Sequence, residues 1–211
     1  MAKTDYQKIS QLYAGLMAEV KERITAIGTA LNKGHAIFPP LFIQEFCFLQ
    51  LWMICETIAI GCLLAHEDIN ARSTRDIVNQ WRASKIMSHL GRLNPNFFPR
   101  AITIHSMKIA RSGLARIHWS PKDGGFLTKD EFVSLYNKSG DMLHRGEVKK
   151  LMKRPLPPLI SPKEIGDWAN KILALLDHHD IKAMGPKIRY ICVMESSDHG
   201  GDVCVTWAPM P

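Results

Sequence analysis

The sequence lacks the short motifs that mark the best-known catalytic and metal sites. It contains no Gly-rich phosphate-binding loop, no G-x-S-x-G nucleophile motif and no H-E-x-x-H zinc motif. Its five cysteines, an odd number, include no C-x-x-C pair, which argues against a structural zinc site. We therefore expect neither a metal nor a cofactor, and we expect a reducing, cytoplasmic location.

The sequence also has no signal-peptide start and no uninterrupted membrane span. The first ten residues, MAKTDYQKIS, have no apolar core. The most apolar stretch, residues 41–65, is long enough to cross a membrane, but Gln44, Glu45, Gln50 and Glu56 interrupt it. Because charged side chains at the centre of a bilayer are costly, this stretch is predicted to be a buried core helix, and no membrane partner is expected.

The overall composition is that of an ordinary globular protein, with 46% hydrophobic and 22% charged residues. The 211 residues can bury a sizeable core and are expected to form a single domain, 1–211, without internal repeats. The formal net charge is +7. This charge is compatible with RNA, DNA or another anionic partner, and equally with a role in solubility alone.

Apolar periodicity and capping signals predict about five helices. Three helix starts carry a capping box, in which a hydroxyl and a later acid or amide satisfy free N–H groups: Thr4, Thr128 and Ser161. The second helix is apolar on nearly all sides and should be central. The expected helices run from Thr4 to about residue 31, from about 40 to 66, from about 73 to 90, and onward from Thr128 and from Ser161.

Two β-hairpins are expected as well, each around a loop that contains glycine. Residues 101–109 and 114–119 flank the first loop, and apolar and basic side chains alternate in the second of these strands. Residues 189–195 and 202–207 form the second pair. If its loop is centred near Asp198, Cys192 and Cys204 lie opposite each other, and in a reducing cell they are expected to be packed thiols rather than a disulfide.

These elements define a mainly α (α+β) fold class. The helical core is expected at about residues 4–152, followed by a late helix and a C-terminal β-hairpin at about 161–208. His178, His179 and Asp180 are expected just after the end of the late helix, where cations suit the helix dipole.

The helix that begins at Thr128 gathers the titratable side chains that most resemble a chemical site. Asn137, Asp141 and His144 are spaced i, i+4, i+7 and therefore line one face. Asp141 can reach His144 and Arg145, three and four residues further on. A carboxylate beside a His favours the imidazolium and fixes its tautomer, as suits a general acid or base.

Two kinds of role remain open for this cluster. A phosphate-sized anion can sit between Lys138, His144 and Arg145. Alternatively the cluster is a structural network, because Glu56 lies on the apolar second helix and a buried carboxylate needs a partner. Lys138, His144 or Arg145 can supply that partner, and the same contact would either hold the fold together or orient a catalytic His.

The stretch YNKSGDMLH, Tyr136 to His144, resembles a divergent HEPN motif, which is an Arg, a polar residue and a His four to six residues beyond the Arg on a late helix of an α-helical bundle. Here Lys138 takes the place of the Arg and Ser139 is the polar residue. The start of the helix, Gly125 to Lys129, is also similar to that of uncharacterised bacterial proteins, which implies no function.

The HEPN resemblance implies a HEPN-like bundle, a homodimer, and one of two functions. The first is a non-catalytic binding or regulatory module, for RNA or another anionic ligand. The alternative is a metal-independent endoribonuclease, a toxin or defence effector, in which His144 moves protons, Lys138 stabilises phosphate charge and Asp141 assists. Asn137, Arg145, Tyr136 and Glu56 would then contribute to binding. Lys offers a point charge where Arg offers a planar fork, which favours the binding module.

Overall fold

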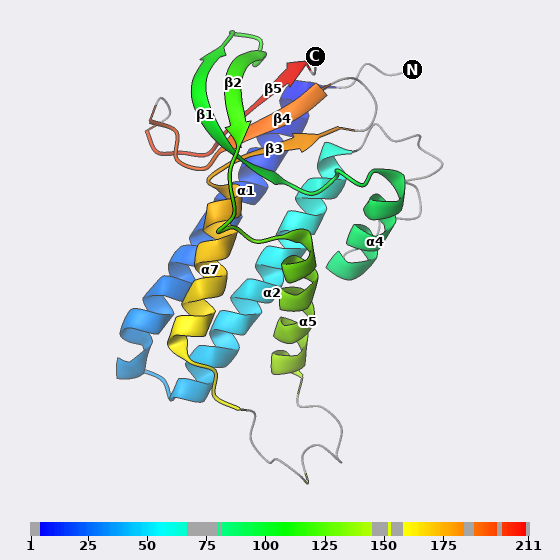
Figure 1. Ribbon diagram of the computed structural model, residues 1–211. Coiled ribbons are helices and arrows are strands. Elements are labelled where there is room, and N and C mark those ends of the chain that lie inside the picture. Colours follow the sequence, from blue (N-terminus) through cyan, green and yellow to red (C-terminus); the bar gives the residue numbers. More distant parts are fainter. Residues whose placement is uncertain are drawn as a thin grey trace.

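The computed structural model describes residues 5–66, 80, 82–144, 152, 158–183, 188–197 and 200–209. It places helices beneath one antiparallel sheet, so the predicted mainly α (α+β) class is confirmed (Figure 1). A short 3-10 helix, η1 (Gly34–Ala36), joins the first two helices. The described residues contain five α-helices: α1 (Tyr6–Lys33), α2 (Pro40–Ala65), α4 (Ala83–Leu93), α5 (Lys129–Leu143) and α7 (Pro162–Leu176).

Local capping explains where three of the helices begin. Thr128 accepts from the backbone N–H of Glu131, and the Glu131 carboxylate accepts from the backbone of Thr128, so the capping box of α5 is complete. Ser161 accepts from the backbone of Glu164 at the start of α7. The first helix differs from expectation, because Asp5 caps α1 and Thr4 lies outside the described residues.

The other two helices follow the apolar pattern. α2 covers the predicted 40–66 almost to the residue. The helix predicted at about 73–90 falls partly outside the described residues, since 67–79 and 81 are not described, and its described part is α4.

Both predicted hairpins form, and a strand that the sequence patterns did not predict joins them into one sheet. The strands are β1 (Arg100–Ile109), β2 (Ala115–Pro121), β3 (His178–Lys182), β4 (Ile188–Val193) and β5 (Cys204–Pro209). Their order is β2-β1-β3-β4-β5, and every pair is antiparallel. His178 to Asp180 do follow the end of the late helix, as expected, because α7 ends at Leu176 with Asp177 as its C-cap. The sequence did not predict that this segment is the central strand.

Partners in α1 and β1 and at the end of α7 stabilise the polar side chains of that central strand. The ring of His179 lies 2.8 Å from the Tyr13 hydroxyl of α1, and its other ring nitrogen lies 2.8 Å from the Leu176 carbonyl. Asp180 accepts two hydrogen bonds from Arg100 of β1. Buried polar groups are stable in a sheet when they are paired in this way.

The predicted pairing of Cys192 with Cys204 is wrong by one residue. Cys192 lies opposite Val205, and Cys204 lies opposite Val193. Because side chains alternate along a strand, this shift places the two thiols on opposite faces of the sheet. No disulfide joins them.

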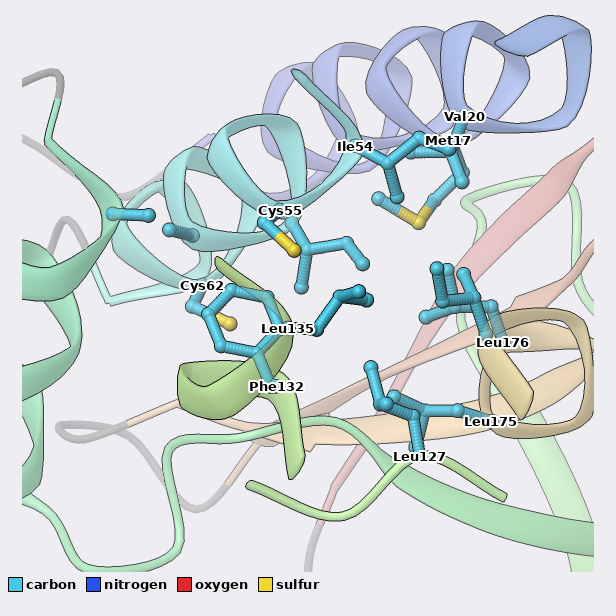
Figure 2. Packing of buried hydrophobic residues seen from close by; sticks show 14 of the residues in the cluster. Met17, Val20, Ile54, Cys55, Cys62, Leu127, Phe132, Leu135, Leu175 and Leu176 are labelled. Atoms are coloured by element: carbon cyan, nitrogen blue, oxygen red, sulfur yellow. The ribbon is translucent and has the colours of Figure 1, made fainter. Parts of the chain in front are cut away.

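One hydrophobic core connects the helices to the sheet. Figure 2 shows Met17 of α1, Ile54 and Cys55 of α2, Phe132 of α5 and Leu176 of α7 converging, and all five are fully buried. α2 is long and apolar enough to cross a membrane by length and composition, and 61% of its most apolar window is buried inside the structure.

Candidate functional site

The cluster predicted on α5 lies at the exposed C-terminal end of that helix. Asn137, Asp141 and His144 are all exposed. His144 is the C-cap residue, and its backbone N–H donates to the Gly140 carbonyl at 3.1 Å. Arg145, the fourth candidate here, lies outside the described residues. The described members of the cluster therefore face solvent rather than a closed cavity.

Lys138 already has a carboxylate partner. Its ammonium group forms an ion pair with Glu164 in the first turn of α7, and both side chains are partly exposed. This ion pair joins α5 to α7 and balances the Lys138 charge. A phosphate at this position would have to compete with Glu164.

Glu56 is buried, as expected, but its hydrogen-bond partner is Tyr136 rather than Lys138 or His144. The Tyr136 hydroxyl donates to the Glu56 carboxylate at 3.4 Å, and the Tyr136 ring stacks on Trp52 with centroids 6.0 Å apart. Burial raises the pKa of the Glu56 carboxyl, and the hydrogen bond from Tyr136 partly offsets that rise. These contacts hold α2 against α5.

A second cluster, which the sequence patterns did not single out, lies on the β1–β2 hairpin. The hairpin projects from the end of the molecule that carries the sheet (Figure 1). One of its faces is apolar and packs on Ile191 of β4 and Ala208 of β5, through residues that include Ile104, Ile117 and Trp119. The other face is therefore turned to solvent.

The solvent face of the hairpin is basic. Lys108 and Arg116 lie directly opposite each other on the two strands. Next to them, the rings of His105 and His118 lie with centroids 5.0 Å apart. Arg111 is exposed at the tip. We call Lys108, Arg111, Arg116, His105 and His118 the basic face.

Like charges face each other within the basic face, and no ion pair with a described carboxylate relieves their repulsion. Among the described residues, no Asp or Glu forms an ion pair with Lys108, Arg111 or Arg116. Like charges placed directly opposite each other destabilise an antiparallel pair. A bound anion would remove this cost, because it would interact favourably with both side chains at once.

The base of the hairpin is held by a buried charged network. Asp180, which is 1% exposed, accepts hydrogen bonds of 2.8 Å from both Nε and Nη2 of Arg100. Arg189 of β4 reaches the same carboxylate at 3.4 Å. The Arg100 and Arg189 guanidinium groups lie 4.4 and 5.0 Å from the ring centroid of Trp119. This network connects β1, β2, β3 and β4.

The tip of the hairpin is fixed to the opposite edge of the sheet. The backbone N–H of Trp207 in β5 donates to the Gly113 carbonyl at 3.3 Å, and the Thr206 hydroxyl donates to the same oxygen. Gly113 has a φ of 81°, which a residue with a side chain rarely adopts. With both ends anchored, the basic face is a preformed surface rather than a free loop.

A sequence signal for the basic face exists, namely a long stretch without acidic residues. No Asp or Glu occurs from residue 77 to residue 122. This stretch contains eight basic residues: Arg82, Lys85, Arg92, Arg100, Lys108, Arg111, Arg116 and Lys122. It therefore carries +8, and because the whole chain carries +7, the remaining residues together carry −1. The net positive charge belongs to α4 and the hairpin.

Within the described ranges, no group of three His, Cys, Asp or Glu side chains is arranged to hold a metal ion. The two candidate sites are thus the α5 end, where Lys138 is ion-paired, and the basic face, where no described residue forms an ion pair with Lys108, Arg111 or Arg116. Comparisons of the chain with protein-family models, with curated proteins and with solved structures found no match.

Proposed function

We propose that the protein is a non-catalytic binding module, of the HEPN-like type that α5 resembles, and that its ligand is single-stranded RNA or DNA. Its binding site is the basic face of the β1–β2 hairpin. The observation that carries the proposal is the cross-strand pair of Lys108 and Arg116, two cations held opposite each other on an anchored hairpin. Phosphate groups neutralise such charges and supply most of the affinity in sequence-independent binding.

The two histidines favour a single strand over a duplex. In single-stranded nucleic acids the bases are unstacked and can pack on the rings of aromatic side chains, His included. The rings of His105 and His118 lie beside the cations, and the Nε2 of His105 is 3.0 Å from the Ser120 hydroxyl, which fixes the ring. Phosphates would contact the Lys and Arg side chains while bases contact the rings.

Binding of a labelled single-stranded RNA, measured by fluorescence anisotropy, tests the proposal. The double variant Lys108→Thr/Arg116→Thr removes both cations and puts in their place Thr, a residue that favours strands. It should lose most of the affinity for the RNA. The control Lys8→Gln/Lys163→Gln removes two exposed charges from α1 and α7 and should bind like the wild type. Wild-type protein that binds no RNA or DNA, or equal affinities for both variants, would refute the proposal.

The endoribonuclease alternative requires Lys138 and His144 to act on one phosphate. The ion pair of Lys138 with Glu164 weighs against this role, because the cation is already neutralised. Incubation of the protein with RNA and EDTA separates the two functions. We expect the RNA to remain intact. Cleavage by the wild type that is lost in His144→Ala would show that the protein is the endoribonuclease and not a non-catalytic binding module.

A further inference from the structure

An open apolar groove lies at the other end of the molecule, where α1 turns into α2. Its volume is about 720 Å³. The turn between α1 and α2, whose residues line the groove, and the hairpin lie at opposite ends of the molecule in Figure 1, so this surface is separate from the proposed nucleic-acid site. The lining residues come from the second half of α1, from the turn at η1, and from the first turns of α2.

The α1 wall of the groove carries no large side chain between its two charged ends. It is built from small side chains: Thr25, Ala26, Thr29 and Ala30. The Thr25 hydroxyl donates to the Lys21 carbonyl and the Thr29 hydroxyl donates to the Thr25 carbonyl, each at 3.0 Å within α1. Because these hydroxyls are satisfied within the helix, the wall presents methyl groups, and small side chains allow a second helix to approach closely.

The opposite side of the groove leaves large apolar side chains in water. Ile37 is 74% exposed, Phe38 56%, Phe42 52% and Phe46 40%. Since an aromatic side chain carries about 150–250 Å² of surface, the three Phe alone expose about 300 Å². A patch of this size matches the largest apolar patch on a typical monomer, and such patches are often functional. A pocket for a drug-sized ligand encloses most of that ligand. This groove is too open to do so, because Ile37 at its edge is 74% exposed. The groove therefore suits the surface of another protein.

The charges at the two ends of the α1 wall identify the partner. Glu22 lines one end of the groove and Lys33 the other. They are eleven residues apart, which is about 16 Å along the helix. Neither forms an ion pair with a described residue. When two copies of α1 pack antiparallel about a two-fold axis, each Glu22 meets the partner's Lys33, so the wall is complementary to itself.

We propose that the groove binds a second copy of this chain, giving an antiparallel two-fold dimer through α1 and the start of α2. The exposed Ile37 and Phe38 of each copy would project into the groove of the other. Small side chains, satisfied hydroxyls, exposed aromatics and opposite charges at the two ends all belong to this one surface. The dimer leaves both hairpins accessible, so it does not depend on the proposed nucleic-acid binding.

Sedimentation velocity on the full chain tests the dimer directly. The wild type should dimerise at micromolar concentration, and Phe42→Lys should weaken the dimer at least about thirtyfold, because it places an unpaired charge at the centre of an apolar contact. Val133→Lys puts the same charge on an exposed apolar residue of α5 and should leave the dimer intact. Thermal melts of both variants establish that the protomers remain folded.

Charge reversal tests the antiparallel arrangement. Glu22→Lys and Lys33→Glu should each weaken the dimer by at least about tenfold, since each brings like charges together. A mixture of the two single variants should form heterodimers, in which both contacts are again between opposite charges. The proposal would be overturned if the wild type stays monomeric. It would also be overturned if each variant dimerises like the wild type and the mixture shows no preference for heterodimers. A groove that binds lipid vesicles or an amphipathic peptide while the chain remains monomeric would overturn it as well.

Discussion

Removing the cross-strand cations of the hairpin should change the salt dependence of nucleic-acid binding by a calculable amount. Each phosphate contact to a single strand contributes about 0.7 to the slope of log affinity against log salt. If Lys108 and Arg116 each neutralise one phosphate, Lys108→Thr/Arg116→Thr lowers the magnitude of that slope by about 1.4. If the two proteins bind equally at 1 M salt, the loss of affinity is about 25-fold at 0.1 M salt and about 600-fold at 0.01 M salt.

The two substitutions should remove phosphate contacts without unfolding the hairpin. Both side chains are exposed, and neither forms an ion pair with a described residue. Removing like charges that face each other should stabilise the hairpin. Fluorescence anisotropy over a salt series gives the slope for each protein. Parallel slopes for the wild type and the double variant would refute phosphate contact at this pair, whatever the change in affinity.

Four further predictions concern stability and the α5 cluster. Asp180→Asn should cost about 3 kcal/mol in urea unfolding, because it leaves the buried guanidinium of Arg189 and the partly exposed guanidinium of Arg100 without their carboxylate. The exposed Asp167→Asn should cost under about 1 kcal/mol. Burial lowers the pKa of His179 to about 4, so as the pH falls the unfolded chain takes up the proton first. The free energy of unfolding should therefore fall by about 3 kcal/mol between pH 6.5 and pH 4. Urea unfolding at a series of pH values measures this loss, and a flat profile would contradict it. Burial raises the pKa of Glu56, so ionisation of its carboxyl opposes folding. Glu56→Gln should therefore raise the melting temperature at pH 8 but not at pH 4. Equal effects at both pH values would contradict this prediction. Lys138→Met should change the free energy of unfolding by under about 1 kcal/mol and leave RNA binding unaltered, and a large loss of binding would move the site to α5.

Features that depend on local contacts were predictable from the sequence. The starts of α5 and α7 follow from Thr128 and Ser161, whose hydroxyls bond to backbone groups three residues away. The first hairpin follows from the alternation around Gly113, a position with a φ that suits glycine. Such signals survive in any tertiary context because their partners are neighbours in the chain.

Features that depend on distant partners were not predictable. Four of the five residues from His178 to Lys182 are polar, yet this segment is the central strand. It is stable there because Arg100 of β1 and Tyr13 of α1 form hydrogen bonds with its buried side chains. In the same way, Glu164 approaches Lys138 only once α5 and α7 pack together. The motif resemblance on α5 could not reveal that its cation is already paired.

The basic face was hidden for a different reason. Alternation in β2 identified a strand, but periodicity does not show which cations meet across a hairpin. The register that places Lys108 opposite Arg116 follows an irregularity in β1 between Ile104 and Ser106. The absence of acidic residues from 77 to 122 was the available signal, and it indicates the charge of the surface without its geometry.

Mapping of bound RNA by NMR tests the central claim most directly. A short single-stranded RNA is titrated into the isotope-labelled full chain, and shifts of the backbone amide signals are recorded residue by residue. We predict that the largest shifts occur in residues 103–109 and 115–120, the two strands of the basic face. Shifts concentrated instead at Asn137 to His144 would contradict this account and place the ligand on α5.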